Sequence, residues 1–272
     1  MTEQPIIVES SKGLARVTLN RPDRRNAFDG NMVDGLCETF DAFGRDPSVR
    51  AIVLAGAGST FCAGADLRWL GADRPVSPEE ARKDAERLLR LLRCIDECPC
   101  PVIGRIQGSA YGGGIGLVAV CDIAMAGTDA TFAFSEVRLG LVPAIIAPFV
   151  LRKTGDSFMR RFGLTAEPFS AATGREAGLV HDVVEPAALD VRVTAIAETI
   201  ISLAPQAVRD TKALLRRLRH MPEEERWNTA VAGNVRARLS SEAQEGLRAF
   251  RERRAPVWKQ PAGGTDRNSE RK

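Results

Sequence analysis

The chain has 272 residues, of which 44% are hydrophobic and 27% charged, as in folded globular proteins, so a disordered or fibrous class is excluded. Its 38 basic and 35 acidic residues leave a formal net charge of +3, too small for a protein that binds nucleic acid or anionic membrane through bulk charge. Only 6% of the residues are aromatic, so stacking platforms for nucleic acid bases are not expected.

Signals for membrane insertion or export are not found in the sequence. No run of about 18 uncharged apolar residues occurs, so no membrane-spanning helix is predicted. The first ten residues hold two acidic residues and no basic one, unlike a signal peptide or a transit peptide. We therefore expect a cytoplasmic protein.

The first elements in chain order are a hairpin, a helix and a buried strand. Residues 6–9 and 14–20 alternate apolar and polar side chains around a Ser-Lys-Gly turn, which predicts two paired strands. Apolar residues recur at helical spacing over residues 32–43, and Asp46-Pro47 stops that helix. Residues 49–55 form an apolar run rich in β-branched side chains, which is typical of a buried strand.

Helices and strands continue to alternate up to residue 134. Residues 77–80, Ser-Pro-Glu-Glu, form a capping box that opens a long amphipathic helix ending near Ile95. Residues 101–106 predict a strand, and three glycines at 112–114 open an apolar helix over 115–120. Further short strands are expected at 123–126 and 131–134. This alternation predicts an α/β fold with right-handed crossovers.

The pattern becomes helical after residue 185. Residues 186–203, 205–219, 222–239 and 241–253 all show helical patterns, and Pro205 and Pro222 fall at helix starts. Residues 263–272 are polar and contain glycine. We therefore predict an α/β core over residues 1–200, a helical region over 201–258 and a disordered tail over 259–272.

Two glycine-bearing loops between a strand and a helix are the first candidates for chemistry. Gly112, Gly113 and Gly114 let a ligand approach the backbone closely, and N–H groups at a helix start favour an anion or a developing oxyanion. Residues 61–67, Phe-Cys-Ala-Gly-Ala-Asp-Leu, are the second such loop. Together the loops could supply the two donors of an oxyanion hole. A tight turn with close helix packing is the alternative for the glycine run.

Two competing kinds of site have weaker support. Residues 114–119 match the dinucleotide fingerprint G-x-G-x-x-A, but they lie in at least the third strand–helix unit, and the fingerprint usually lies in the first. Cys94, Cys98 and Cys100 include no CxxC pair and have no nearby His, so reduced, mostly buried thiols are favoured over a metal site. We predict no metal and no dinucleotide.

A carboxylate is the best candidate for proton transfer. The sequence has no G-x-S-x-G nucleophile motif, and one of its two histidines, His181, lies in an apolar stretch that favours a structural role. Glu136 follows a predicted strand among apolar residues, where desolvation would raise its pKa and suit acid–base chemistry. The alternative for Glu136 is a salt bridge with Arg138 on the same face of an extended segment.

Several motifs occur in a specific order along the chain. They are Asn20-Arg21-Pro22 with Asn26-Ala27, the loops 63–67 and 112–114, Cys121-Asp122-Ile123, Glu136 with Leu139-Gly140-Leu141, and Ala177-Gly178-Leu179-Val180. In this combination the chain resembles the crotonase (enoyl-CoA hydratase/isomerase) superfamily, over residues 5–258. The resemblance implies a spiral of ββα units whose C-terminal helices assemble a homotrimer or a dimer of trimers.

The resemblance also implies a ligand and roles for site residues. The substrate would be an acyl-CoA thioester, so coenzyme A would be part of the substrate and no other cofactor is expected. The backbone N–H groups of Ala65 and Gly113 would hold the thioester carbonyl and stabilise an enolate, with Glu136 as acid and base. Arg25 would offer charge to the CoA phosphates. The substrate-binding residues would be Arg25, Ala27, Ala63, Asp66, Leu67, Arg68, Gly112 and Arg138.

Two departures from the usual hydratase pattern narrow the resemblance. Gly116 stands where typical hydratases carry a second glutamate, and residues 144–148, Ala-Ile-Ile-Ala-Pro, replace a glycine-rich loop. The chain is similar in this to bacterial methylglutaconyl-CoA hydratases of leucine degradation and to isohexenylglutaconyl-CoA hydratases. Their substrates carry a second carboxylate, so a cation is expected in the acyl pocket, supplied by Arg138 or Arg68. The alternatives are that Arg138 only tethers Glu136 and that Arg68 lies on a solvated helix face.

Three functions are therefore in competition. The favoured one is hydration of a branched, dicarboxylic enoyl-CoA by a carbon–oxygen lyase. Double-bond isomerisation is the second, since it suits a single carboxylate that removes one proton and returns it elsewhere. The third is acyl-CoA or RNA binding without turnover, because one predicted helix carries a row of basic residues. A solvated or subunit-contacting role is favoured for that basic surface. That surface consists of Arg209, Lys212, Arg216 and Arg219.

Overall fold

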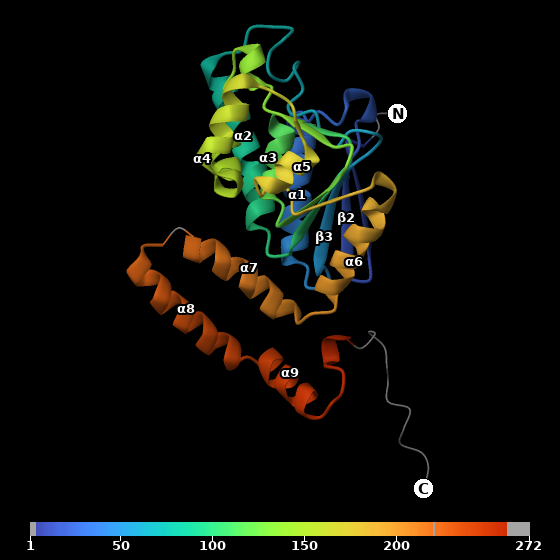
Figure 1. Ribbon diagram of the computed structural model, residues 1–272, viewed down its shortest axis with the longest axis vertical. Helices are drawn as coiled ribbons and strands as arrows, with labels where there is room; N and C mark the ends of the chain where they lie inside the picture. Colours follow the sequence, from blue (N-terminus) through green and yellow to red (C-terminus); the bar gives the residue numbers. More distant parts are fainter. Residues whose placement is uncertain (1–3, 220, 260–272) are drawn as a thin grey trace. The chain divides into compact units, whose positions relative to one another are not determined.

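The computed structural model describes residues 4–219 and 221–259 (Figure 1). The chain divides into two compact units, Met1–Ala197 and Glu198–Lys272. Both β-sheets belong to the first unit, and the described part of the second unit is built from helices. None of the described helices combines the length and hydrophobicity needed to span a bilayer. The predicted α/β class is confirmed.

A six-stranded sheet of order β1-β2-β3-β4-β6-β9 forms the frame of the first unit. The predicted hairpin is present, since β1 (Ile6–Ser11) and β2 (Leu14–Leu19) pair antiparallel. Four strands then add in parallel, as expected for strands joined by helical crossovers. They are β3 (Ala51–Gly56), β4 (Val102–Ile106), β6 (Ile123–Gly127) and β9 (Asp182–Val184).

A second, three-stranded sheet has the order β5-β7-β8. It contains β5 (Ser109–Tyr111), β7 (Thr131–Ala133) and β8 (Phe169–Ser170). The sequence patterns predicted β7 but not β5 or β8, because strands of two or three residues are too short to show a reliable period. Phe169 of β8 stacks on Phe132 of β7, with 5.4 Å between the ring centroids.

Two of the longer helices of the first unit begin at capping side chains, and one of these caps is the predicted capping box. The Asp29 side chain accepts a hydrogen bond from the Met32 N–H at the start of α1 (Gly30–Arg45), and Ser77 and Glu80 complete the capping box of α2 (Pro78–Glu97). The remaining helices are α3 (Gly113–Val120), α4 (Ala147–Thr165), α5 (Ala171–Glu176) and α6 (Leu189–Ile201), with short 3₁₀ helices η1 (Pro22–Arg24), η2 (Glu136–Leu139) and η3 (Pro186–Ala188). The sequence patterns did not identify α4, which is interrupted at Gly155 with φ of 76°.

Helix α3 lies inside the core of the first unit. Every residue from Gly114 to Val120 is buried, as expected for a helix that is apolar on all sides. Its N-terminus therefore carries backbone N–H groups into the interior, where no bulk water satisfies them. This helix start, and not a surface loop, is where the glycine run of residues 112–114 lies.

The second unit contains three longer helices in its described part: α7 (Pro205–Arg219), α8 (Glu223–Arg238) and α9 (Ser241–Arg251), followed by η4 (Val257–Lys259). The Glu242 carboxylate accepts hydrogen bonds from the Gln206 and Ala207 N–H groups at 3.0 and 2.7 Å, which ties α9 to the start of α7. The predicted disordered tail, apart from Lys259, lies outside the described residues.

Candidate active site

The two glycine-bearing loops meet inside the first unit. A parallel bridge joins Phe28 to Ala65, and a Cβ atom placed on Gly64 would lie only 3.1 Å from the backbone nitrogen of Gly113. Gly64 has φ of +91° and Gly112 has φ of +48°, values that side chains other than glycine rarely adopt. Glycine is therefore required at both positions for the loops to approach each other.

Two backbone N–H groups at this junction have no protein acceptor among the described residues, those of Ala65 and Gly113. The bridge uses the peptide groups beside Ala65, because Phe28 N–H donates to Gly64 and Asp66 N–H donates to Phe28, both at 2.9 Å. The N–H of Ala65 therefore points away from Phe28. Gly113 is the first residue of α3, whose first N–H groups have no helical acceptor. Both residues line one pocket, so this pair has the composition of an oxyanion hole.

The pocket at this junction has a volume of about 390 Å³ and mostly apolar walls. One face of α2 forms one wall, and residues 67–76 and 139–146 contribute the others. Of the described residues that line it, only Glu136 and Asp84 are charged, and none is Lys, Arg or His. An acyl chain fits such walls, whereas an anionic group finds no cation there.

Glu136 lies beside the two free N–H groups, at the start of η2. A Cβ atom on Gly112 would lie 3.3 Å from its Oε1 atom, so the carboxylate and the glycine loop are in contact. The Oε2 atom is buried and has no hydrogen-bond partner within the described chain. Burial raises the pKa of Glu136, and a hydrogen bond from its own backbone partly opposes that shift. An unpartnered, desolvated carboxylate beside an oxyanion hole is suited to proton transfer.

The position of the missing second glutamate is filled by another side chain. A Cβ atom on Gly116 would lie 2.5 Å from Cγ2 of Ile146 and 3.4 Å from Cδ2 of Leu92. The space is therefore closed by aliphatic groups, which leaves no room there for a water molecule or a substrate branch. Glu136 is the one carboxylate in contact with the glycine loop in the described chain.

A second cavity of about 600 Å³ shares lining residues with the acyl pocket, including Ala63, Ala65 and Leu67. This groove contains three arginines, Arg24, Arg25 and Arg68. It brings together six of the predicted substrate-binding residues, while Gly112 lines the acyl pocket. The six in the groove are Arg25, Ala27, Ala63, Asp66, Leu67 and Arg68.

The Asn-Arg-Pro and Asn-Ala motifs brace this groove. The buried Asn26 side chain donates to the carbonyls of Ala57 and Thr60 at 2.8 and 2.7 Å. Arg21 donates to the Ala27 carbonyl at 2.6 Å and to the Asp66 carboxylate at 2.9 Å. The Asp66 side chain is thus occupied by Arg21, so its contribution to the groove is to hold the loop that carries Ala65.

The two arginines proposed as the cation of the acyl pocket lie elsewhere. Arg138 donates from Nη2 to the Ala166 carbonyl at 2.7 Å and lines neither of the two cavities. Arg68 lies in the outer groove, where its exposed side chain pairs with Asp73 at 3.4 Å.

The remaining sequence candidates have structural roles. The Nδ1 atom of His181 accepts a hydrogen bond from Ala124 N–H at 3.0 Å, and burial lowers the pKa of this imidazole. The Sγ atoms of Cys98 and Cys100 donate to the backbone carbonyls of Phe40 and Val49 at 3.8 and 3.2 Å. Thiols that donate in this way are protonated and are poor metal ligands. The described chain contains no cluster of His, Cys, Asp and Glu suited to a metal ion.

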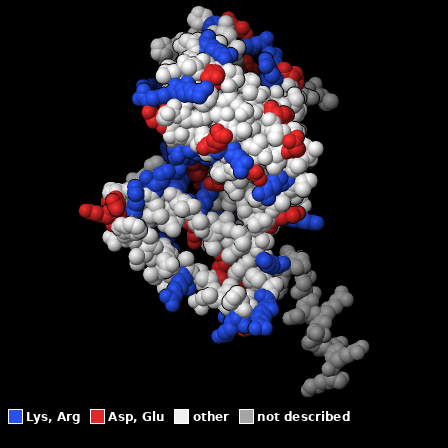
Figure 2. Space-filling view, viewed as in Figure 1, with Lys and Arg blue, Asp and Glu red and all other residues white. Residues whose placement is uncertain are grey.

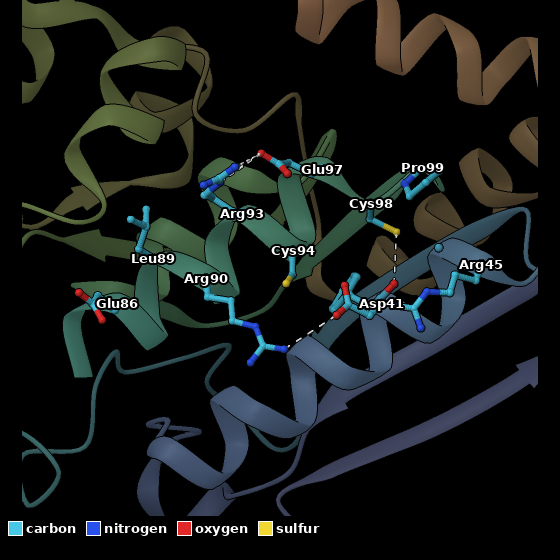
Figure 3. A pocket seen from close by; sticks show the side chains of 12 residues that line it. Asp41, Arg45, Glu86, Leu89, Arg90, Arg93, Cys94, Glu97, Cys98 and Pro99 are labelled. Atoms are coloured by element: carbon cyan, nitrogen blue, oxygen red, sulfur yellow. Dashed lines mark hydrogen bonds and ion pairs between the residues drawn. The ribbon is translucent and has the colours of Figure 1, made fainter. Parts of the chain in front are cut away.

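A cavity of about 540 Å³ between α1 and α2 is the main alternative location for a site (Figure 3). Four of its six charged side chains are paired with one another, Arg90 with Asp41 at 3.9 Å and Arg93 with Glu97 at 3.2 Å. Figure 3 shows Cys94 between these pairs, and desolvation raises the pKa of its thiol. A protonated thiol among paired charges is a weak nucleophile, so this cavity offers less suitable chemistry than the pocket that contains Glu136.

The sequence analysis missed one charged residue of the acyl pocket, Asp84. The apolar residues that predict an amphipathic α2 are Leu88, Leu91, Leu92 and Ile95, and Asp84 precedes Leu88 by four residues. Residues four positions apart on a helix share a face, so this periodicity could have placed Asp84 in the pocket wall.

Comparisons with known proteins agree with this geometry. The family described as "Enoyl-CoA hydratase/isomerase" matches residues 9–261. The enoyl-CoA hydratase AKT6-1 of Alternaria alternata is 35% identical over 91% of this chain and 82% of its own length. The (E)-benzylidenesuccinyl-CoA hydratase of Thauera aromatica is 32% identical over 94% and 99%. A crystal structure of an enoyl-CoA hydratase from Mycobacterium smegmatis superposes with a TM-score of 0.91 at 35% identity, covering 95% of this chain and all of that one (100%).

Proposed function

Because the chain belongs to the enoyl-CoA hydratase/isomerase family, we propose that it hydrates the α,β double bond of an enoyl-CoA with Glu136 as the acid and base. One observation carries this proposal. The buried, unpartnered Oε2 of Glu136 shares a pocket with the free N–H groups of Ala65 and Gly113. The adjoining groove with Arg24 and Arg25 would receive the CoA part, and no other cofactor is needed.

A single carboxylate is sufficient for the reaction if it moves one proton twice. The Glu136 carboxylate takes a proton from water while the water oxygen bonds to the β-carbon. The π electrons move to the thioester oxygen, which becomes an enolate held by the N–H groups of Ala65 and Gly113. Glu136 then delivers the same proton to the α-carbon, and the thioester carbonyl re-forms. One water is added, and the carboxylate is regenerated.

The second part of the proposal concerns which acyl group the substrate carries. The apolar walls support an uncharged, branched acyl chain. A 3-methylglutaconyl-type substrate, as handled in leucine degradation, is the second candidate, supported by the motif resemblance around Gly116 and Glu136. Its free carboxylate requires a compensating cation, which the described lining residues do not include.

Turnover of paired substrates tests both parts. Crotonyl-CoA, 3-methylcrotonyl-CoA and 3-methylglutaconyl-CoA would be compared for wild type and Glu136→Gln. The proposal expects hydration that is lost in the variant, with ¹⁸O from labelled water in the product. Double-bond migration without ¹⁸O uptake would instead identify an isomerase. A strong preference for 3-methylglutaconyl-CoA would select the second candidate.

We propose that the helical region over residues 201–258 assembles a homotrimer or a dimer of trimers. An apolar stripe on α8 supports this, since Trp227, Val231 and Val235 are 67%, 65% and 50% exposed in the single chain. Exposed apolar area of this kind marks an interface. Light scattering should give three or six times the chain mass, and Trp227→Lys should shift it towards that of one chain.

We also propose a cytoplasmic enzyme that binds neither membrane nor nucleic acid. Figure 2 shows Lys and Arg interspersed with Asp and Glu over the face of the first unit that it presents. Four basic residues of α7 are engaged in interactions within the chain. They are Arg209, Lys212, Arg216 and Arg219. RNA binding with a steep salt dependence would contradict this proposal.

A further inference from the structure

The acyl pocket contains a second carboxylate that the proposed chemistry does not use. Asp84 lines the pocket from α2, on the same helical face as Ala81, Ala85 and Leu88. Its side chain is 23% exposed, so it is largely removed from water. Its neighbours on this face of α2 are small or aliphatic, so a charge at this position acts on whatever enters the pocket with less screening than in bulk water.

Asp84 keeps most of its negative charge within the pocket. Among the residues that the structure describes, its ion-pair partner is Arg87, which lies 3.8 Å away and does not line the pocket. Arg87 is shared with Asp34 of α1, which is closer, at 3.3 Å. The carboxylates of Asp34 and Asp84 therefore share the guanidinium of Arg87, and these three charges sum to a net charge of about −1. Since Glu136 is the other charged lining residue described, the pocket has an acidic character with no basic group to offset it.

We propose that Asp84 is a specificity-determining residue that excludes acyl chains with a negatively charged end. A carboxylate entering this pocket would lose water and meet a like charge, and both effects oppose binding. An acyl chain with an uncharged end meets only the apolar walls. The proposal rests on the proposed function only in that the acyl part of a CoA thioester occupies this pocket.

Binding of two saturated thioesters tests the role of Asp84 apart from catalysis. Valeryl-CoA and glutaryl-CoA both carry five-carbon acyl groups that cannot be hydrated, and they differ in a methyl or a carboxylate at the end. Isothermal titration should show tighter binding of valeryl-CoA by the wild type. Asp84→Asn should tighten glutaryl-CoA by at least about fivefold and leave valeryl-CoA within about twofold, as expected for removal of one like charge at low effective dielectric.

Asp41→Asn is the matched control, because it removes the same charge from an α1 carboxylate that pairs with an α2 arginine, Arg90, and neither residue lines the acyl pocket. It should change neither affinity. Asp84→Ala provides a second variant, and melting curves show that each variant is folded. Equal changes for both ligands in Asp84→Asn, or the same selective gain in Asp41→Asn, would overturn the proposal, as would tighter binding of glutaryl-CoA by the wild type.

The two proposals can fail separately. Crotonyl-CoA hydration by the same preparations reports on the chemistry of Glu136, whereas the affinity ratio reports on Asp84. An inactive wild type whose preference for valeryl-CoA is reduced by Asp84→Asn would refute the hydratase and support the role of Asp84. An active wild type whose affinity ratio is unchanged by Asp84→Asn would refute only the role of Asp84.

Discussion

Adding one methyl group at Gly113 should disable the oxyanion hole without unfolding the protein. A Cβ atom at this position would lie 2.5 Å from Cζ and 3.1 Å from Cε1 of Phe28. Carbon atoms in contact lie about 3.5–4.0 Å apart, so Gly113→Ala forces the start of α3 or the Phe28 ring to move by about 1 Å. The φ of Gly113 is not in the left-handed region, so the perturbation is steric and not torsional.

The expected loss follows from what this backbone N–H does. Removing one oxyanion-hole donor lowers kcat by about 10²–10³, or about 3–4 kcal/mol. A displacement of about 1 Å misaligns the Gly113 N–H with the thioester oxygen, so we expect kcat to fall about hundredfold. The KM should change less, because the donor binds the developing enolate more strongly than the ground-state carbonyl.

Stopped-flow absorbance of the conjugated thioester measures this directly. Gly174→Ala is the matched control, since Gly174 is also a helical glycine, and its Cβ would lie 3.7 Å from Phe132, an ordinary contact. Phe28→Leu combined with Gly113→Ala should recover part of the rate by shortening the obstructing side chain. A folded Gly113→Ala enzyme with the wild-type kcat would refute the assignment of Gly113 as a donor.

Three further predictions concern the carboxylate, the missing glutamate and the groove. Burial raises the pKa of Glu136 above its usual value of 4.5, so the folded protein binds this proton more tightly than the unfolded chain does. The ionised carboxylate therefore lowers the free energy of unfolding as the pH rises above 4.5. Glu136→Gln should therefore abolish hydration and raise the melting temperature at pH 7 but not at pH 4; equal melting temperatures at pH 7 would contradict this. Wild-type kcat/KM should rise with pH through that raised pKa. Gly116→Glu should lower the free energy of unfolding by about 1–3 kcal/mol through overpacking against Ile146. Adding Ile146→Ala should restore part of that stability, and urea unfolding measures both variants. A Gly116→Glu protein as stable as the wild type would contradict the close packing at this position. Arg25→Ala should raise KM for CoA thioesters about tenfold at low salt and less at high salt, with kcat retained. An unchanged KM would show that Arg25 does not bind the CoA part of the substrate.

Local patterns were sufficient for much of the framework. The capping box at Ser77, the hairpin around residues 11–13 and the helical periodicity of residues 32–43 all involve groups within a few positions of each other. Glu136 and the two glycine loops could also be selected as candidates from their flanking strands and apolar neighbours. Short-range hydrogen bonds and side-chain periodicity depend on local sequence alone, so these features can be predicted from the sequence without the structure.

Which of these groups share a pocket was decided only by the tertiary structure. The approach of Gly64 to Gly113, the filling of the Gly116 site by Ile146, and the diversion of Arg138 to the Ala166 carbonyl each join segments between 28 and 49 residues apart. The placement of Asp84 in the acyl pocket likewise required α2 to pack beside the glycine loop. Such contacts arise from close packing of whole elements, which no local pattern encodes, because a side chain's neighbours are set by the rotation and spacing of the elements against each other.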